Sequence, residues 1–233
     1  MRVKMVVAYD GTNYSGWQIQ PNGVTIEQKL NEALQALLGE DIRVTGASRT
    51  DAGVHSLGNV CIFDTDTRMP AEKISYALNQ RLPEDIVVQD SCEVPDTFHP
   101  RFSRSRKTYE YRILNRRFRM PTRRLDTYFY HYPLDVEKMQ EAADYLVGEH
   151  DFKSFCSNKR MKKSSVRTIC SIDILNDTER ELLTITYRGN GFLYNMVRIL
   201  TGTLIEIGLG VRSAEDIPPI LEGCDRGLAG HTA

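Results

Sequence analysis

The stretch TIEQKLNEALQALLG, residues 25–39, carries the pattern that decides the fold of the first half of the chain. Its apolar residues recur every three or four positions and therefore fall on one stripe of an amphipathic helix. They are Ile26, Leu30, Ala33, Leu34, Leu37 and Leu38. Thr25 opens the helix, Gln28 stands three residues on as the partner in a capping box, and Gly39 is a C-terminal stop. The sequence thus predicts a capped surface helix.

Runs rich in β-forming residues flank this helix on both sides. The predicted strands of this half are Val3–Tyr9, Ile42–Thr45, Asn59–Phe63 and Ile86–Val94. A second helix begins at Pro70 and runs through about Leu82, since proline suits the first helical position. The resulting order, β-α-β-β-α-β, is that of a ferredoxin-like unit.

The second half repeats this order less cleanly. Its predicted strands are Thr108–Leu114, Thr127–Tyr132, Arg167–Leu175 and Leu182–Arg188, with a hairpin turn at Asn176 and Asp177. Its predicted helices are Val136–Val147, the strongly apolar Phe192–Ile207 and a short one capped by Ser213. We expect a second ferredoxin-like unit that lacks its last strand, because the sequence stops at GLAGHTA. The predicted class is α+β, with units at residues 1–100 and 101–233 and a central cleft whose walls carry basic patches.

Composition excludes several classes of protein. With 41% hydrophobic and 26% charged residues in 233, the chain is typical of a globular protein. No apolar run approaches the ~18 residues that span a bilayer, and the N-terminus does not resemble a signal peptide. The five cysteines never form C-x-x-C, which indicates reduced thiols, and the histidines show no ligand spacing. We therefore expect a cytoplasmic protein with no metal and no membrane partner.

The formal net charge of −1 conceals two basic segments. Residues 101–124 hold ten basic residues against one acid, Glu110, and residues 153–167 hold six basic residues and no acid. Clustered Lys and Arg are typical of a surface that binds nucleic-acid phosphates. A solvated face is the alternative interpretation of each charge run taken alone.

The loop GASRTDAGVHSLGNV, residues 46–60, is the most informative for chemistry. It lies between two predicted strands, and its glycines allow positive φ and close approach to a ligand. Asp51 is a candidate catalytic carboxylate, although an Asx turn before Gly53 would also explain it. His55 is open to a structural role in hydrogen bonding, and Arg49 to simple solvation.

Four segments resemble the TruA family of pseudouridine synthases, in the family's order. SRTDAGVH (residues 48–55) is similar to the loop that carries the catalytic aspartate, and YDGTNYSGWQIQPNGVTIE (residues 9–27) to the N-terminal motif. KTYEYRI (residues 107–113) is similar to the segment with a substrate-stacking tyrosine, and GNGFLYNMVRILTGTLIEIG (residues 189–208) to the helix with a characteristic arginine. The resemblance therefore spans the chain.

The resemblance implies a pseudouridine-synthase fold and a set of roles. Asp51 is the expected catalytic nucleophile or base, Tyr109 stacks on the target base, and Arg198 is the second catalytic residue. The implied substrate is tRNA, modified at uridines 38 to 40 of the anticodon stem-loop, and the implied assembly is a homodimer. No cofactor is expected, since the isomerisation changes no oxidation state and transfers no external group.

Physical reasoning supports these assignments. Desolvation raises the pKa of a carboxylate in a dry pocket, so an adjacent cation is needed to keep it charged. Arg198 suits this role, because an arginine within an apolar run is costly to bury unless it is paired; a helix-surface arginine reaching water is the alternative. Tyr109 could instead be a core residue of its strand, beside Tyr111. Further candidates for substrate binding are Arg49, which we expect to hold the flipped nucleotide, His55, Arg101, Arg104 and Lys107.

Two rival classes remain at this stage. A non-catalytic RNA-binding module would explain the basic segments but not Asp51 together with Arg198. A hydrolase would use Ser48, Asp51 and His55, yet their crowding in one loop disfavours the geometry of a catalytic triad.

Overall fold

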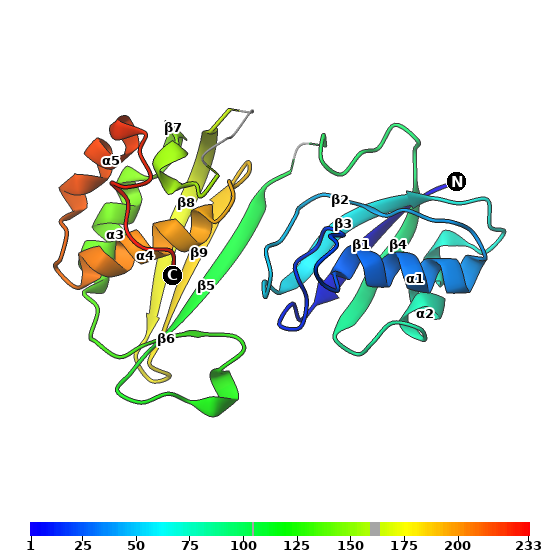
Figure 1. Ribbon diagram of the computed structural model, residues 1–233, viewed down its shortest axis with the longest axis horizontal. Coiled ribbons are helices and arrows are strands. Elements are labelled where there is room, and N and C mark those ends of the chain that lie inside the picture. Colours follow the sequence, from blue (N-terminus) through cyan, green and yellow to red (C-terminus); the bar gives the residue numbers. More distant parts are fainter. Residues whose placement is uncertain (104, 159–163) are drawn as a thin grey trace. The chain divides into compact units, whose positions relative to one another are not determined.

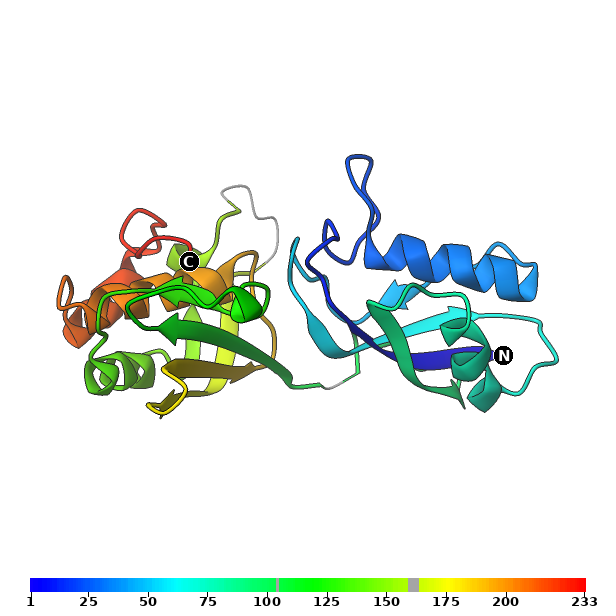
Figure 2. The same ribbon diagram turned by 90° about the horizontal axis from the view of Figure 1, so that it is seen from below.

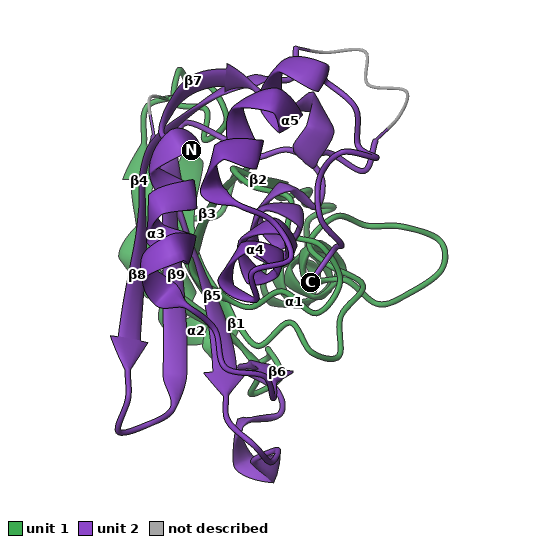
Figure 3. Ribbon diagram, turned by 90° about the vertical axis from the view of Figure 1, so that its left-hand side faces the viewer, with its two compact units in different colours: residues 1–104 green, residues 105–233 purple. Residues whose placement is uncertain are grey.

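The computed structural model describes residues 1–103, 105–158 and 164–233. The chain divides into two compact units, unit 1 at residues 1–104 and unit 2 at residues 105–233 (Figure 3). Each unit has its own sheet and its own hydrophobic core. The predicted α+β class is confirmed.

Unit 1 has the connectivity of a ferredoxin-like unit. Its elements are β1 (Arg2–Tyr9), α1 (Ile26–Leu38), β2 (Thr45–Gly46), β3 (Ser56–Asp64), α2 (Ala71–Asn79) and β4 (Ile86–Val94). The sheet order is β2-β3-β1-β4, and every neighbouring pair is antiparallel. Both helices contribute to one core with alternate residues of β1, so they cover the same face of the sheet (Figure 1).

The capping of α1 follows the sequence only in part. The hydroxyl of Thr25 accepts from the backbone N–H of Gln28 at 3.3 Å, and Gly39 ends the helix with φ of 73°. The side chain of Gln28 donates to Glu32 in the next turn, at 2.8 Å. Only the threonine half of the predicted capping box is therefore present.

The predicted strand at residues 42–45 is mostly wrong. Only Thr45 and Gly46 pair with β3, although Ile42 and Val44 are buried as a strand would bury them. The backbone N–H of Val44 donates to the side chain of Asn31 in α1, at 2.9 Å. A helix side chain thus replaces the expected ladder partner. Helix α2 also ends earlier than predicted, at Asn79 rather than near Leu82.

Unit 2 contains a five-stranded sheet with the order β6-β5-β9-β8-β7. Its strands are β5 (Lys107–Asn115), β6 (Tyr128–Tyr130), β7 (Gly148–Asp151), β8 (Val166–Asp177) and β9 (Leu182–Gly189). Its α-helices are α3 (Val136–Tyr145), α4 (Met196–Gly208) and α5 (Ile217–Gly223), and its 3₁₀ turns are η1 (Pro121–Arg123), η2 (Lys153–Phe155) and η3 (Ala214–Asp216). The series β5-α3-β8-β9-α4 follows ferredoxin-like order, and β6 pairs in parallel with the end of β5.

Left-handed backbone shifts two boundaries of unit 2 from their predicted places. Helix α4 begins at Met196 rather than Phe192, because Asn195 at its N-cap has φ of 59°. The β8–β9 turn occupies residues 178–181, with Glu181 at φ of 52°, while Asn176 and Asp177 remain in β8. The short strand β7 was not predicted.

Helices α3 and α4 share one core with alternate residues of the central strands of unit 2. Figure 2 shows α4 lying over the strands of its unit, and α1 over those of unit 1. Ser213 caps the 3₁₀ turn η3 through a capping box with Asp216, as predicted for a short helix there. Among the described residues, no helix is long and apolar enough to cross a membrane.

Candidate active site

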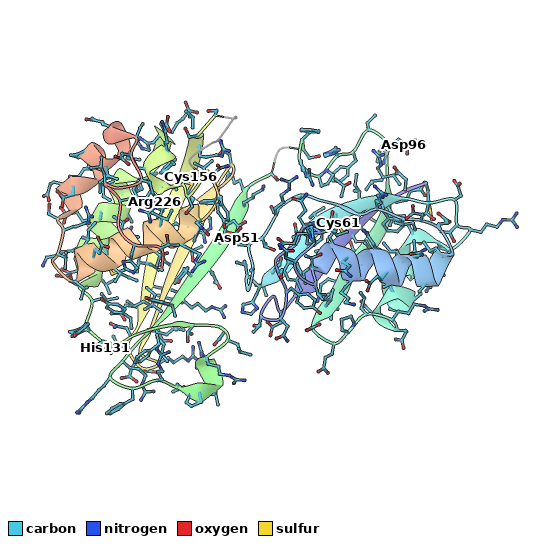
Figure 4. The ribbon with its side chains drawn as sticks, in the orientation of Figure 1. Asp51, Cys61, Asp96, His131, Cys156 and Arg226 are labelled. Carbon is cyan, nitrogen blue, oxygen red and sulfur yellow. The ribbon has the colours of Figure 1, made fainter. Side chains whose placement is uncertain are left out.

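Asp51 lies in the loop that joins β2 to β3, on an irregular segment of unit 1 (Figure 4). Asp51 is partly exposed, and Arg49 and Ala52 near it in the loop are exposed. Arg49 makes no hydrogen bond or ion pair with any residue that the structure describes. The loop thus presents a carboxylate and a cation two positions apart.

The segment that follows β1 anchors this loop on both sides of Asp51. The backbone N–H of Trp17 donates to Thr50 O at 3.1 Å, and that of Gly53 donates to Tyr14 O at 3.2 Å. The hydroxyl of Tyr9, at the end of β1, lies 2.8 Å from Thr50 Oγ1. Together these hydrogen bonds hold the backbone of the loop in one conformation. The aspartate is therefore displayed from a rigid support.

Two glycines allow the segment to approach the loop this closely. Gly16 has φ of 84°, and a Cβ there would lie 2.4 Å from Thr50 O. A Cβ on Gly11 would lie 2.1 Å from Val54 O. Any side chain at either position would displace the backbone beside Asp51. Glycine is therefore required for both conformation and space at residue 16, and for space at residue 11.

The base of the loop is fixed by contacts to β3 and to the end of unit 1. The side chain of Asn59 accepts from Ser48 N at 3.3 Å and donates to Ser48 O at 3.1 Å. Arg101 donates through Nε to Gly46 O at 2.8 Å. Arg101 is exposed, and this contact gives it a structural role whether or not it also binds substrate.

His55 stands at the far end of the loop, beside an acidic side chain. Its Nδ1 lies 2.9 Å from Asp10 Oδ1 and 3.1 Å from Gly11 N. A protonated Nδ1 donates to Asp10, whereas an unprotonated one accepts from Gly11, so the two contacts are alternatives. Hydrogen bonds from Thr12, first through its hydroxyl and then through its backbone, lower the pKa of Asp10, and His55 lowers it further.

Unit 2 carries the predicted stacking tyrosine on β5. Tyr109 pairs with Tyr187 of β9, which is buried in the core, so Tyr109 points to the face that the helices cover. Its ring meets that of Phe192 edge-on, with centroids 5.1 Å apart and planes at 78°. Tyr109 is only partly buried, and so is Lys107 at the start of β5. The ring is thus oriented by Phe192 while part of it stays accessible.

Tyr111 lies two residues further along the same face and is also partly buried. Burial raises its pKa to about 12, and the positive charge of Arg198 opposes that rise. Its ring contacts Tyr128 of β6 edge-on, with centroids 6.1 Å apart. The phenol of Tyr111 and the guanidinium of Arg198 therefore share one electrostatic environment.

Arg198 corrects one step of the sequence reasoning. We expected it to be buried in the apolar run, yet it is exposed, while Met196, Ile199 and Leu200 point into the core. The helical period places the arginine on the opposite face from these residues. Its Nε donates to Ala233 O at 2.6 Å, and Ala233 N donates back to Arg198 O at 3.2 Å. No carboxylate among the described residues contacts it.

The segment between β5 and β6 combines positive charge with exposed aromatic rings. Arg117 lies over the ring of Phe118, 5.0 Å from its centroid, and Arg119 lies over Phe129 at 4.7 Å. Phe118 is 65% exposed, and neither arginine forms an ion pair with a described residue. By contrast, Arg123 lies 3.4 Å from Asp126. The first basic segment is thus partly neutralised and partly free to meet an anion.

Several predicted residues lie outside the part of the chain that the structure describes. Arg104 is one of them, and four of the six basic residues of the second segment are others: Lys159, Arg160, Lys162 and Lys163. Within the described ranges, no group of three or more His, Cys, Asp and Glu side chains could hold a metal ion.

Comparisons with known proteins converge on one family. A family model described as tRNA pseudouridine synthase matches residues 5–103 and 142–233. The chain belongs to the tRNA pseudouridine synthase family. It is 48% identical to tRNA pseudouridine synthase A of Thermoanaerobacter sp. strain X514, over 99% of this chain and 94% of that protein. It is 46% identical to that of Acetivibrio thermocellus over the same shares, and 47% identical to that of Halalkalibacterium halodurans over 100% of this chain and 88% of that protein.

Membership of the tRNA pseudouridine synthase family confirms the predicted resemblance and the prediction of an isomerase. The rival classes of hydrolase and non-catalytic RNA-binding module are thereby set aside. Sequence reasoning gave no role to Tyr9, Gly16 and Trp17, which support the loop around Asp51. The signal for them was the motif at residues 9–27, whose glycines and single tryptophan a mere connection would not need.

Proposed function

We propose that this synthase converts uridine to pseudouridine at positions 38, 39 and 40 in the anticodon stem-loop of tRNA, with Asp51 as the catalytic nucleophile or base. The observation that supports this proposal is the anchoring of the loop around Asp51. Hydrogen bonds from Trp17 N–H to Thr50 O and from Gly53 N–H to Tyr14 O fix the backbone on both sides of a carboxylate that stays partly exposed. A structural aspartate in an Asx turn would not require such support from a segment over thirty residues away.

The reaction balances without any cofactor. The bond from C1′ of the ribose to N1 of uracil breaks, the base rotates, and a bond from C1′ to C5 forms. C5 loses its proton to water, and N1 gains one. A carboxylate can serve either as the nucleophile that holds an intermediate or as the base that removes a proton. The enzyme must therefore hold one nucleotide through the rotation while it controls a single carboxylate.

Unit 2 supplies the groups that would complete this chemistry. The accessible part of the Tyr109 ring stacks on the target base, which is worth ~1 to 3 kcal/mol. Arg198 keeps its Nη nitrogens available, since only its Nε is bonded to a described residue. A guanidinium with free Nη nitrogens favours the ionised form of a carboxylate brought near it. The proposal thus requires both units to act on the same nucleotide.

The remaining polar residues bind RNA in this proposal. Arg49 is exposed two residues from Asp51 and suits the phosphate of a flipped nucleotide or the gap that the nucleotide leaves. His55, Arg101, Arg104 and Lys107 also contact substrate. Arg117 and Arg119 add phosphate contacts, and the exposed ring of Phe118 adds a stacking surface. We further propose that the enzyme works in the cytoplasm as a homodimer.

Release of tritium from tRNA labelled at C5 of uridine tests the proposal. The wild-type enzyme in buffer with EDTA should release tritium, Asp51→Asn should release none, and both should bind tRNA alike. Asp66→Asn is the matched control, because Asp66 is an exposed aspartate of the same unit and should keep full activity. Replacing uridines 38, 39 and 40 by cytidine, first one at a time and then all together, tests the positions. Activity in Asp51→Asn, or release that survives replacement of all three, would refute the corresponding part.

A further inference from the structure

The last residues of the chain lie along one face of α4, where Figure 1 shows the segment after α5 returning to that helix. We call residues 229–233 the C-terminal strap. The backbone N–H of Gly230 donates to Thr203 Oγ1 at 2.9 Å, and that of His231 donates to Glu206 Oε1 at 3.0 Å. Ala233 N donates to Arg198 O at 3.2 Å. Three strap amides thus have acceptors on a single helix.

Paired glycines make this approach possible. A Cβ on Gly202 of α4 would lie 2.0 Å from His231 O, and a Cβ on Gly230 would lie 2.8 Å from the Cα of Thr203. Backbone therefore rests on backbone at this crossing. Glycine within a helix is less favourable than alanine by roughly 1 kcal/mol, so its presence at residue 202 needs a reason of this kind.

Arg226 shapes the strap before it reaches α4 (Figure 4). Its Nη1 donates to Gly230 O at 2.9 Å and to Ala229 O at 3.3 Å, and its Nη2 donates to Thr232 Oγ1 at 3.1 Å. Glu206 holds the middle of the strap and is largely buried. It accepts from Arg212 Nε at 2.6 Å as well as from His231. These contacts use charged groups to order a segment that has no secondary structure of its own.

The strap ends on Arg198. Its last described residue, Ala233, accepts from Arg198 Nε at 2.6 Å and donates to the carbonyl of the same residue. An exposed arginine otherwise samples many rotamers, with about 2 kcal/mol of side-chain entropy. A partner on Nε selects one orientation of the planar fork and leaves both Nη nitrogens to point at a carboxylate.

We propose that the C-terminal strap is a positioning device for Arg198, and that Gly202 and Glu206 are positioning residues that act through it. The proposal rests on the proposed function, because Arg198 matters only if it works with Asp51. Glu206 and Gly202 touch no substrate in this account. Their effect on catalysis passes through the strap to the guanidinium.

Gly202→Ala is the sharpest probe. The added methyl group should favour the helix but expel the strap, since 2.0 Å to His231 O leaves no room for it. Hydrogen exchange should then accelerate at the amides of Gly230, His231 and Ala233, while the exchange of α4 stays slow. Because misplacement by about 1 Å can cost 10²-fold, we expect kcat to fall on the order of 10- to 100-fold with little change in KM.

Two further comparisons separate positioning from general damage. Glu206→Ala should behave like Gly202→Ala, whereas Glu206→Gln keeps an acceptor for His231 N and should restore most of the activity. Asp135→Ala removes the N-cap of α3 in the same unit and should lower stability without changing kcat.

A double-mutant cycle with Arg198→Lys closes the test, because lysine keeps the charge but lacks the Nε–H. Gly202→Ala should cost little in the Arg198→Lys background if the strap acts through Arg198. Equal fold-losses in both backgrounds, wild-type kcat in Gly202→Ala, or strap amides that stay protected in it would each overturn the inference. Wild-type kcat in Arg198→Lys alongside an inactive Asp51→Asn would instead refute the role of Arg198 in the proposed function.

Discussion

Replacement of Gly16 by alanine should uncouple catalysis from RNA binding. A Cβ at this position would lie 2.4 Å from Thr50 O, whereas ordinary contact begins at 3.4 Å. The loop must therefore move by about 1 Å next to Asp51. A displacement of that size can cost about 10²-fold in rate when a reacting group is misplaced. Tritium release should fall by this factor, while the dissociation constant for tRNA stays close to wild type.

Gly39→Ala provides the matched control for this prediction. Gly39 has φ of 73°, close to the 84° of Gly16, yet a Cβ there would meet nothing within 4 Å. Both variants place alanine in left-handed backbone, which costs roughly 1 to 2 kcal/mol of stability. Only Gly16→Ala also strikes the loop. The difference in kcat between the two variants therefore isolates the contact with Thr50 from the common backbone strain.

Both variants should be assayed well below their melting temperatures, with circular dichroism to establish folding and filter binding to measure tRNA affinity. Equal values of kcat in Gly16→Ala and Gly39→Ala would refute the reasoning, because the loop would then tolerate the shift. A loss of tRNA binding that matches the loss of rate would also contradict it.

Two other predictions concern pH and salt. Hydrogen bonds from Thr12, above all from its hydroxyl, lower the pKa of Asp10 below its usual 3.8 in the folded state, so their contribution to stability is present above about pH 4 and is lost as the pH falls through the lowered pKa. In urea titrations, the difference in free energy of unfolding between wild type and Thr12→Ala should be constant from about pH 5 to 7 and should shrink below pH 4. A difference that grows in acid would contradict this prediction. Arg117→Ala and Arg119→Ala should each reduce the salt dependence of tRNA binding by about one unit of slope, whereas Arg123→Ala, whose charge Asp126 already neutralises, should change it less; equal slopes in all three would argue against contacts with phosphate.

Elements with strong local signals were predictable from the sequence. Strand β4 has the predicted bounds, Ile86–Val94, and α1 begins after Thr25 and ends at Gly39 as expected. The ends of helices and strands that depend on a left-handed backbone at residues other than glycine could not be predicted from the sequence. Asn195 and Glu181 adopt positive φ, and nothing in their neighbouring residues signals it. Val44 was misassigned because its amide pairs with a side chain thirteen positions away in sequence.

The candidate site divides in the same way. Local patterns placed Asp51 on a glycine-rich loop and Tyr109 on an alternating strand, whereas the roles expected for them came from the resemblance to the family. The residues that hold the Asp51 loop in place could not be identified from the sequence, since Tyr9 lies 41 residues from Thr50 and their contact is a property of the folded sheet. The burial of Arg198 was mispredicted because an apolar run suggests burial on all sides, while the helical period leaves one face of α4 open to the strap.

Each unit fixes its proposed catalytic residue by the same physical means. In unit 1 the segment around Gly16 rests on the backbone of Thr50, next to Asp51, and in unit 2 the strap rests on Gly202 and ends on Arg198. A missing side chain in each case lets two stretches of backbone meet, and hydrogen bonds then lock the contact. Such supports keep charged groups oriented before the substrate arrives, so little reorganisation remains for the reaction itself. It follows that glycine substitutions at these two crossings should lower kcat more than the removal of any single hydrogen bond that holds them, because a methyl group displaces the whole segment whereas a lost hydrogen bond weakens it by only about 1 kcal/mol.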